Sequence, residues 1–166
     1  MGPDREGVRL TAQELASERM LLCRVGTRLC GIAVRHVAET MRPLPLEPVA
    51  GMPAFVLGLA LIRGTPTPVI DLAFLLLGPS ERQTATRFVT VKAGQRIAAL
   101  AVSHVIGIRD IPTRTLGALP PLAQEVKADF IETIGSLDDD MLMMLNGARI
   151  VPSSVWTVLS TSEVPP

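Results

Sequence analysis

Few side chains in this sequence are of the types that catalysis or metal binding requires: two histidines, two cysteines and one acidic run. His36 and His104 occupy equivalent positions in an internal repeat, so duplication explains their presence and we expect structural or surface roles for both. The sequence has no His-x-x-x-His or Cys-x-x-Cys spacing, no Gly-x-Ser-x-Gly motif and no Gly-rich phosphate loop. We therefore expect neither enzymatic activity nor a bound metal or cofactor.

The cysteines and the acidic run each have a structural interpretation. Cys23 and Cys30 flank Gly26-Thr27, which suits a two-residue hairpin turn, so we expect the cysteines to face each other across two strands. A disulfide between them is geometrically conceivable. Two reduced, buried thiols are the interpretation that we favour. Asp138-Asp139-Asp140 has no partner at ligand spacing, and we expect it to form a solvated hairpin tip.

Arg63 lies where a recognition residue could lie. It follows the apolar run from Leu59 to Ile62 and precedes Gly64-Thr65-Pro66, which predicts a sharp turn with its guanidinium in solvent. Two interpretations stay open at this point. Arg63 is either an ordinary solvated loop residue or a recognition residue that offers its planar fork of donors to a partner.

Two pairs of matching segments indicate that the chain contains an internal repeat. Gly26 to Val37 matches Gly94 to Val105 at one constant offset, with six of twelve positions identical. A weaker match at a second, larger offset relates 55–71 to 130–146. The change in offset implies a seven-residue insertion in the second copy, which we place at the Pro-rich stretch from Gly117 to Pro121. The sequence therefore predicts a duplicated domain.

The elements expected in each copy are short strands separated by turn residues, which is typical of small all-β barrels. Strands are expected at about 20–25, 29–34, 59–63, 67–71, 87–92, 96–102, 132–137 and 141–146. Short helices are expected at 53–56, 72–76 and 147–151. Runs such as 96–108 are apolar at nearly every position, so both faces should be covered and the two barrels should pack against each other.

Composition limits the classes of partner. The 166 residues carry 16 basic and 16 acidic side chains, so no net field attracts nucleic acid or an anionic membrane. The longest apolar stretch, Ala54 to Ile62, has about half the length that a helical membrane span requires, and we expect no direct membrane insertion. Met1 to Arg19 lacks the apolar segment of a signal peptide, which favours a cytoplasmic protein.

Four segments in the first half form recognisable sequence motifs: Val37-Ala38-Glu39, Pro53-Ala54-Phe55-Val56-Leu57-Gly58, Ile62-Arg63-Gly64 and Pro68-Val69-Ile70-Asp71-Leu72. In these segments and their spacing the sequence resembles the CheW family of chemotaxis coupling proteins. The resemblance extends from about Met20 to Leu159. At three positions the sequence departs from the residues usual in the family: Leu61 replaces an Asn, Cys30 replaces an aromatic residue and Ser103 replaces an Asp.

The resemblance implies an all-β fold of two SH3-like five-stranded β-barrels related by a pseudo-two-fold axis, with short helices. We expect a flexible N-terminal segment at 1–18, a CheW-like domain at 19–160 and a flexible tail at 161–166. Within the domain, barrel 1 is expected at about 19–80, barrel 2 at about 85–150 and a C-terminal segment at 151–160.

The resemblance also implies a function without catalysis: an adaptor that couples methyl-accepting chemoreceptors to the histidine kinase CheA beneath the membrane. The implied partners are the regulatory domain of CheA, itself a CheW-like double barrel, and the cytoplasmic tip of the receptors. Val37, Glu39 and Arg63 match positions associated with receptor contact at the groove between barrels, and Gly64 adjoins Arg63. No residue is assigned to kinase binding. The alternative is an SH3-like peptide- or partner-binding scaffold of a signalling cluster outside chemotaxis.

Overall fold

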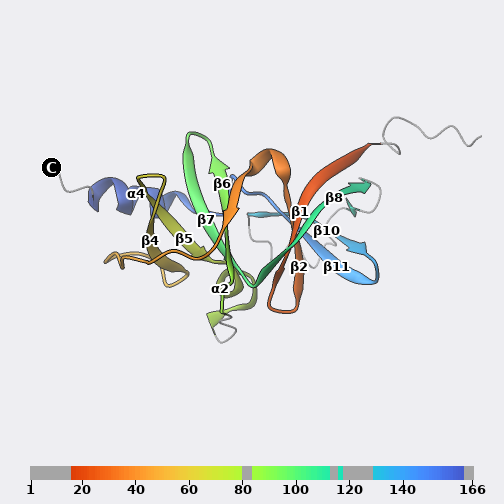
Figure 1. Cartoon of the computed structure of the whole chain (residues 1–166), viewed down its shortest axis with the longest axis horizontal. Helices are drawn as coiled ribbons and strands as arrows, with labels where there is room; N and C mark the ends of the chain where they lie inside the picture. The colour runs from red at the N-terminus through yellow and green to blue at the C-terminus, as the bar shows by residue number, and fades with distance from the viewer. Residues whose placement is uncertain (1–15, 80–83, 113–115, 118–128, 163–166) are drawn as a thin grey trace, which may run out of the picture.

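The computed structural model describes residues 16–79, 84–112, 116–117 and 129–162. Most of these residues lie in strands, which form two sheets side by side along the long axis of the molecule (Figure 1). The six-stranded sheet contains β1 (Ser17–Val25), β2 (Arg28–Ala33), β8 (His104–Pro112), β9 (Leu116–Gly117), β10 (Ile131–Leu137) and β11 (Asp140–Leu145). The five-stranded sheet contains β3 (Val37–Met41), β4 (Val56–Ile62), β5 (Thr65–Asp71), β6 (Arg87–Ala93) and β7 (Arg96–Val102). The helical elements are η1 (Val34–His36), α2 (Leu72–Leu77) and α4 (Ser153–Ser162).

Each sheet combines strands from both copies of the repeat. The six-stranded sheet has the order β8-β1-β2-β11-β10-β9, and the five-stranded sheet has the order β3-β6-β7-β5-β4. The first hairpin of each copy therefore pairs with the remaining strands of the other copy, through the parallel ladders β2–β11 and β5–β7. The expected barrel 1 at about 19–80 and barrel 2 at about 85–150 consequently do not correspond to the two sheets.

The antiparallel pairing confirms the repeat that the sequence predicts. In the β1–β2 hairpin Cys23 lies opposite Cys30, and at the equivalent place in the β6–β7 hairpin Val91 lies opposite Ala98. The whole β4–β5 ladder recurs in β10–β11 at the second offset of the repeat, with its register shift at the corresponding place. A shared register requires the same alternation of side chains toward the two faces.

The parallel ladders obey the same two offsets. Ile70 of β5 pairs with Leu100 of β7, and their counterparts, Leu145 of β11 and Ile32 of β2, are also paired. The strands of the two sheets are therefore paired in the same register, although each sheet takes its first hairpin from a different copy of the repeat. This is the internal pseudo-symmetry expected for the duplicated fold.

The eight strands predicted from the sequence are present as β1, β2, β4, β5, β6, β7, β10 and β11, with ends that differ by a few residues. The prediction missed β3, β8 and β9. The apolar run 96–108 is divided at Ser103 between β7 and β8, which belong to different sheets. The Ser103 N–H donates to the carbonyl oxygen of Arg24 at 2.9 Å and fixes this crossing.

One of the three predicted helices is confirmed. α2 begins after Asp71, whose carboxylate accepts a hydrogen bond from the Phe74 N–H at 3.2 Å, and it ends at Gly78. The helix expected at 53–56 is wrong, because 54–55 form a turn and Val56 is already the first residue of β4. The helix expected at 147–151 is also wrong, since a residue before proline disfavours helical geometry and α4 begins only after Pro152.

The main core lies between the two sheets. Fully buried side chains from the six-stranded sheet, including Cys23 and Ile32, pack there with Ile70 and Leu100 of the five-stranded sheet. The opposite face of β7 is also covered, because Ala99 belongs to a second cluster on the far side of the same sheet. This confirms that the continuous apolar runs are covered on both faces.

The two sheets are open in the part of the chain that the structure describes. Within these residues no ladder joins β3 to β4 or β8 to β9, and one sheet has a short sixth strand. The all-β class and the pair of SH3-like units are confirmed, whereas full closure of each unit into a five-stranded barrel is not observed. The expected flexible ends, 1–18 and 161–166, and the insertion at 117–121 fall largely outside the described residues. No helix in the described part of the chain is long and apolar enough to cross a membrane.

Candidate functional site

Arg63 and Gly64 form the two-residue turn between β4 and β5. Ile62 pairs directly with Thr65, and the turn residues have φ values of 49° for Arg63 and 78° for Gly64. Positive φ at both central residues is the requirement of a type I′ hairpin turn. Glycine meets that requirement without steric cost, whereas arginine is an uncommon residue there. The turn carries the Arg63 side chain into solvent, where 79% of its surface is exposed.

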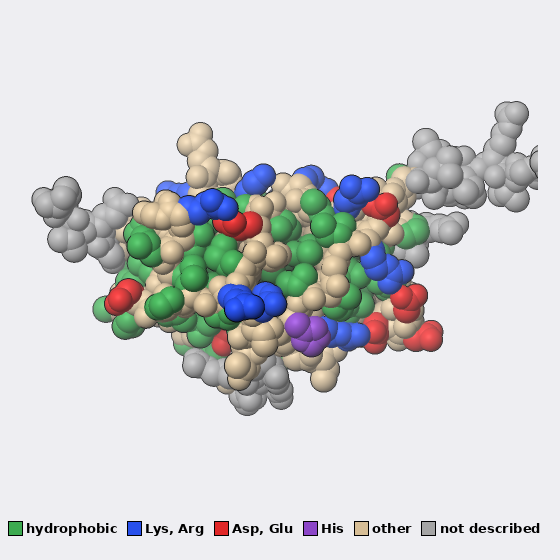
Figure 2. Space-filling model, in the orientation of Figure 1, with side chains coloured by type: hydrophobic (Ala, Val, Ile, Leu, Met, Phe, Trp, Pro, Cys, Tyr) green, Lys and Arg blue, Asp and Glu red, His purple; other side chains and the backbone are tan. Residues whose placement is uncertain are grey.

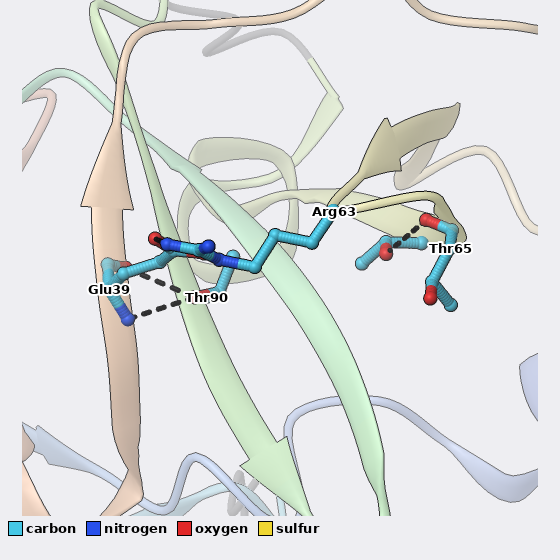
Figure 3. A network of polar contacts seen from close by, with 5 residues as sticks. Glu39, Arg63, Thr65 and Thr90 are labelled. Atoms are coloured by element: carbon cyan, nitrogen blue, oxygen red, sulfur yellow. Dashed lines mark hydrogen bonds and ion pairs between the residues drawn. The ribbon is translucent and has the colours of Figure 1, made fainter.

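Arg63 forms a bidentate ion pair with Glu39 of β3 (Figure 3). The Nε–H of Arg63 donates to Oε1 of Glu39 and Nη2 donates to Oε2, with both distances at 2.8 Å. These hydrogen bonds lower the pKa of the Glu39 carboxyl below its usual 4.5, and they raise the pKa of Arg63. So exposed a pair adds little to folding stability, but it fixes the direction of the guanidinium.

A β-bulge positions Glu39 on β3. The register between β3 and β6 shifts between Val37 and Glu39, so Ala38 has no partner opposite. The hydroxyl of Thr90 accepts a hydrogen bond from the Glu39 N–H at 3.0 Å and donates to the Glu39 carbonyl oxygen at 3.1 Å (Figure 3). Thr90 is fully buried, so its hydroxyl satisfies backbone groups that the bulge would otherwise leave unpaired.

A cavity of about 900 Å³ adjoins the ion pair, and we call it the α4 groove. Its walls come from β3 and β6, from the β4–β5 hairpin, from the β6–β7 turn and from α4 at the end of the molecule (Figure 1). The larger apolar side chains that line it are Leu59, Ile62, Ile97, Trp156 and Leu159. At the rim the guanidinium carbon of Arg96 lies 5.1 Å from the centre of the Trp156 ring, a cation–π contact. The groove thus combines an apolar interior with charged groups at its edge, which suits protein recognition.

The structure brings together two of the four residues predicted for receptor contact. Glu39 and Arg63 touch each other and line the α4 groove. Gly64 follows Arg63 in the turn but does not line the groove. Val37 is half-buried and packs against the main core between the sheets. The sequence placed these residues at a groove between barrels, whereas this cavity lies on the five-stranded sheet and is bordered on one side by α4.

Sequence reasoning missed Arg96 and Trp156. The hairpin turn that carries Arg96 was predicted, but the helix that carries Trp156 was not, because the expected helix ended before Pro152. The single tryptophan in the chain was the available signal, since aromatic and arginine side chains are enriched where proteins bind one another.

The cysteines and the acidic run have the structural arrangements that the sequence predicts. Cys23 and Cys30 face each other across β1 and β2 as free, buried thiols. Burial raises the pKa of both thiols, that of Cys30 to about 12. Asp138 and Asp139 form the exposed turn between β10 and β11, and Asp138 pairs with Arg109 at 2.9 Å.

Among the described residues, neither the two histidines nor the surface charges cluster into a binding site. His36 and His104 lie at matching positions immediately before or at the start of β3 and β8. No group of three or more His, Cys, Asp or Glu side chains among the described residues is arranged to hold a metal ion. On the face shown in Figure 2, charges of both signs are interspersed with hydrophobic side chains.

Comparison with known proteins gives consistent matches. A model of the CheW-like domain family matches residues 19–155. Protein FrzA of Myxococcus xanthus is 28% identical over 157 residues, which cover 93% of this chain and 96% of FrzA. The chemotaxis protein CheW of Klebsiella aerogenes is 24% identical over 144 residues, which cover 86% of each chain. The crystal structure of the scaffolding protein TtCheW from Thermoanaerobacter tengcongensis superposes with a TM-score of 0.68 at 22% identity, over 82% of this chain and 95% of that one.

Proposed function

The chain belongs to the CheW-like domain family, and on that premise we propose that it is a non-catalytic adaptor in chemotaxis signalling. In this proposal it couples methyl-accepting chemoreceptors to a CheA-type histidine kinase. It works in the cytoplasm, at the inner face of the membrane, where receptor arrays hold it by protein contacts alone. No covalent step is required of any of its residues.

The ion pair between Glu39 and Arg63 is the observation that supports receptor binding best. The pair uses Nε and Nη2 of Arg63, so Nη1 can still donate to a carboxylate or carbonyl of a partner. Because the turn and the carboxylate both constrain the guanidinium, little of its side-chain freedom remains to be lost on binding. We assign receptor contact to this pair, to the exposed backbone at Gly64 and to the exposed part of the half-buried Val37 on β3.

The kinase is proposed to bind a different surface. An adaptor must hold receptor and kinase at once, so the two contacts cannot share the Glu39–Arg63 face. The regulatory domain of CheA is the proposed kinase partner, and the outer faces of the two sheets are the remaining surface for it. Two independent surfaces predict that a substitution at one leaves binding at the other intact.

The test is a binding measurement with two purified partners: a cytoplasmic receptor fragment and the CheA regulatory domain from the same organism. Calorimetry should show saturable binding of the wild-type protein to each partner, and a ternary complex when all three are mixed. Arg28→Ala, which removes an exposed arginine at the β1–β2 turn of the six-stranded sheet, away from the Glu39–Arg63 pair, is the control and should bind both partners normally. Failure to bind either partner would reject the proposal and leave a scaffold of another signalling cluster.

A further inference from the structure

The two sheets are related by the repeat, but they differ in side-chain size at one set of equivalent positions. This difference creates the α4 groove. In the six-stranded sheet this end is filled by Leu22, Leu29 and Leu142, which belong to one buried apolar cluster. The offsets of the repeat place Thr90, Ile97 and Thr67 at the corresponding positions of the five-stranded sheet. The replacement of two leucines by threonines removes side-chain volume, and the isoleucine keeps the volume of the leucine that it replaces. A cavity therefore exists at one end of the pseudo-symmetric pair and a packed core at the other.

The threonines do not make the cavity polar. The hydroxyl of Thr67 donates to the carbonyl oxygen of Thr65 at 3.0 Å, and the hydroxyl of Thr90 bonds to the backbone of Glu39. Both hydroxyls are thus engaged with backbone atoms, so neither adds a free polar group to the wall of the cavity. Since Ile97 and Leu159 also line the cavity, its interior suits an apolar side chain.

The rim of the cavity has an excess of positive charge. The charge of Arg63 is balanced by Glu39, with which it makes two hydrogen bonds. Arg96 lies over the Trp156 ring, and no ion pair joins it to an acidic side chain among the described residues. A guanidinium in this position attracts a carboxylate, and its low hydration cost favours an interface contact.

We propose that the α4 groove is a docking pocket for a partner-protein segment that inserts one bulky apolar side chain and places a carboxylate against Arg96. The chemistry of the occupant follows from the apolar interior and the unbalanced cation at the rim. The volume of about 900 Å³ admits a large apolar side chain with part of its backbone. The inference deepens the proposed adaptor function, on which it rests for the partner being a protein, and assigns α4 a direct part in recognition.

The test selects twelve-residue peptides from a random display library on the wild-type protein, which needs neither receptor nor kinase. Enriched peptides should combine an acidic residue with Leu, Phe, Met or Trp, and should shift the NMR signals of the Ile97 and Leu159 methyl groups. Thr67→Leu, which introduces the residue found at Leu142 in the filled sheet, should weaken their binding at least tenfold. It should do so without lowering the melting temperature.

A charge test at the rim separates the two parts of the proposal. Arg96→Glu should weaken binding at least tenfold, whereas the matched Arg28→Glu, at the counterpart position of the filled sheet, should leave it unchanged. Replacing the peptide carboxylate by an amide should abolish the difference between wild type and Arg96→Glu.

Equal binding of the selected peptides by wild type and Thr67→Leu would overturn the proposal, as would the absence of any enrichment. If Thr67→Leu lowers the melting temperature, Ile97→Phe narrows the same cavity from β7 and decides the question in its place. These outcomes are independent of receptor-fragment binding by the wild-type protein. A failure of this inference and a failure of the proposed function can therefore be told apart.

Discussion

The carboxylate of Glu39 and the guanidinium of Arg63 are joined by two hydrogen bonds of 2.8 Å, although 24 residues separate them in the chain. One comes from the bulged strand β3 and the other from the tip of the β4–β5 hairpin. Neither end of the pair lies in the core, so it can be changed without unfolding the protein. Substitutions at this pair can therefore test partner binding separately from folding stability.

Arg63→Ala and Arg63→Glu should weaken receptor-fragment binding by about thirtyfold or more, the usual effect of removing an interface arginine. The melting temperature should shift by no more than about 3 °C, because the side chain is exposed. Calorimetry with the receptor fragment and thermal unfolding measure the two effects. Glu39→Ala should also weaken receptor binding, while all three variants keep binding the kinase.

The exchanged pair Glu39→Arg with Arg63→Glu is the control for this prediction. The double variant can restore the ion pair, but it exchanges the positions of the positive and negative charges that a partner would meet. If the double variant recovered receptor binding, the pair would serve to connect β3 to the hairpin. The two side chains would then not contact the receptor themselves. Loss of kinase binding in the single variants would contradict separate surfaces.

The titration of Glu39 should depend on Arg63. In the folded protein the hydrogen bonds from Arg63 lower the pKa of Glu39 below 4.5, so the carboxylate stays charged at pH values where an unpaired Glu begins to protonate. Its small stabilising contribution is present above the unfolded pKa and is lost as the pH falls through the lowered folded pKa. NMR titration of the Glu39 side-chain carboxyl carbon should give a midpoint below 4.5 in wild type and a higher one in Arg63→Ala. Equal midpoints would show that the ion pair does not persist in solution.

Cys23 and Cys30 should be unreactive in the native protein. Both side chains are fully buried, and burial raises the pKa of each thiol far above neutral pH, so neither accessible surface nor thiolate is present. Ellman's reagent at pH 8 should leave both unmodified over an hour and modify both at once in about 6 M guanidinium chloride. Rapid native modification would indicate that the β1–β2 hairpin opens. A native protein with no titratable thiol after unfolding would indicate a disulfide.

Gly58→Ala should destabilise the protein more than Gly107→Ala, although both glycines have φ near the same value, 144° and 149°. A Cβ at Gly58 would lie 2.6 Å from the carbonyl oxygen of Glu47, whereas one at Gly107 meets nothing within 4 Å. Gly107→Ala should therefore cost about 1–2 kcal/mol for its backbone conformation alone. Gly58→Ala should cost about 1–3 kcal/mol more, because Glu47 must move and its backbone bridge to Leu59 must weaken. Urea denaturation of both variants measures the difference, and equal values would show that the loop at Glu47 yields freely.

The sequence by itself determined the repeat, the hairpins and their register. Gly26-Thr27 and Gly94-Gln95 fix two turns, and the alternation of apolar residues around them fixes which side chains face each other. These are local properties, because a turn and its flanking strands contain all the residues that decide them. Arg63 could be singled out for the same reason, since its exposure follows from its place in a turn next to Gly64.

Only the tertiary structure decided which sheet each hairpin joins. The parallel contacts of Ile32 with Leu145 and of Ile70 with Leu100 connect segments that no turn relates, and either copy offers a strand of similar apolar character. The choice is made by burying both faces of β2 and both faces of β7 at once, which is a requirement of the whole chain and not of any one segment. The meeting of Glu39 with Arg63, and of Trp156 with Arg96, depends on that choice, because each pair joins elements that come together only when the sheets are assembled.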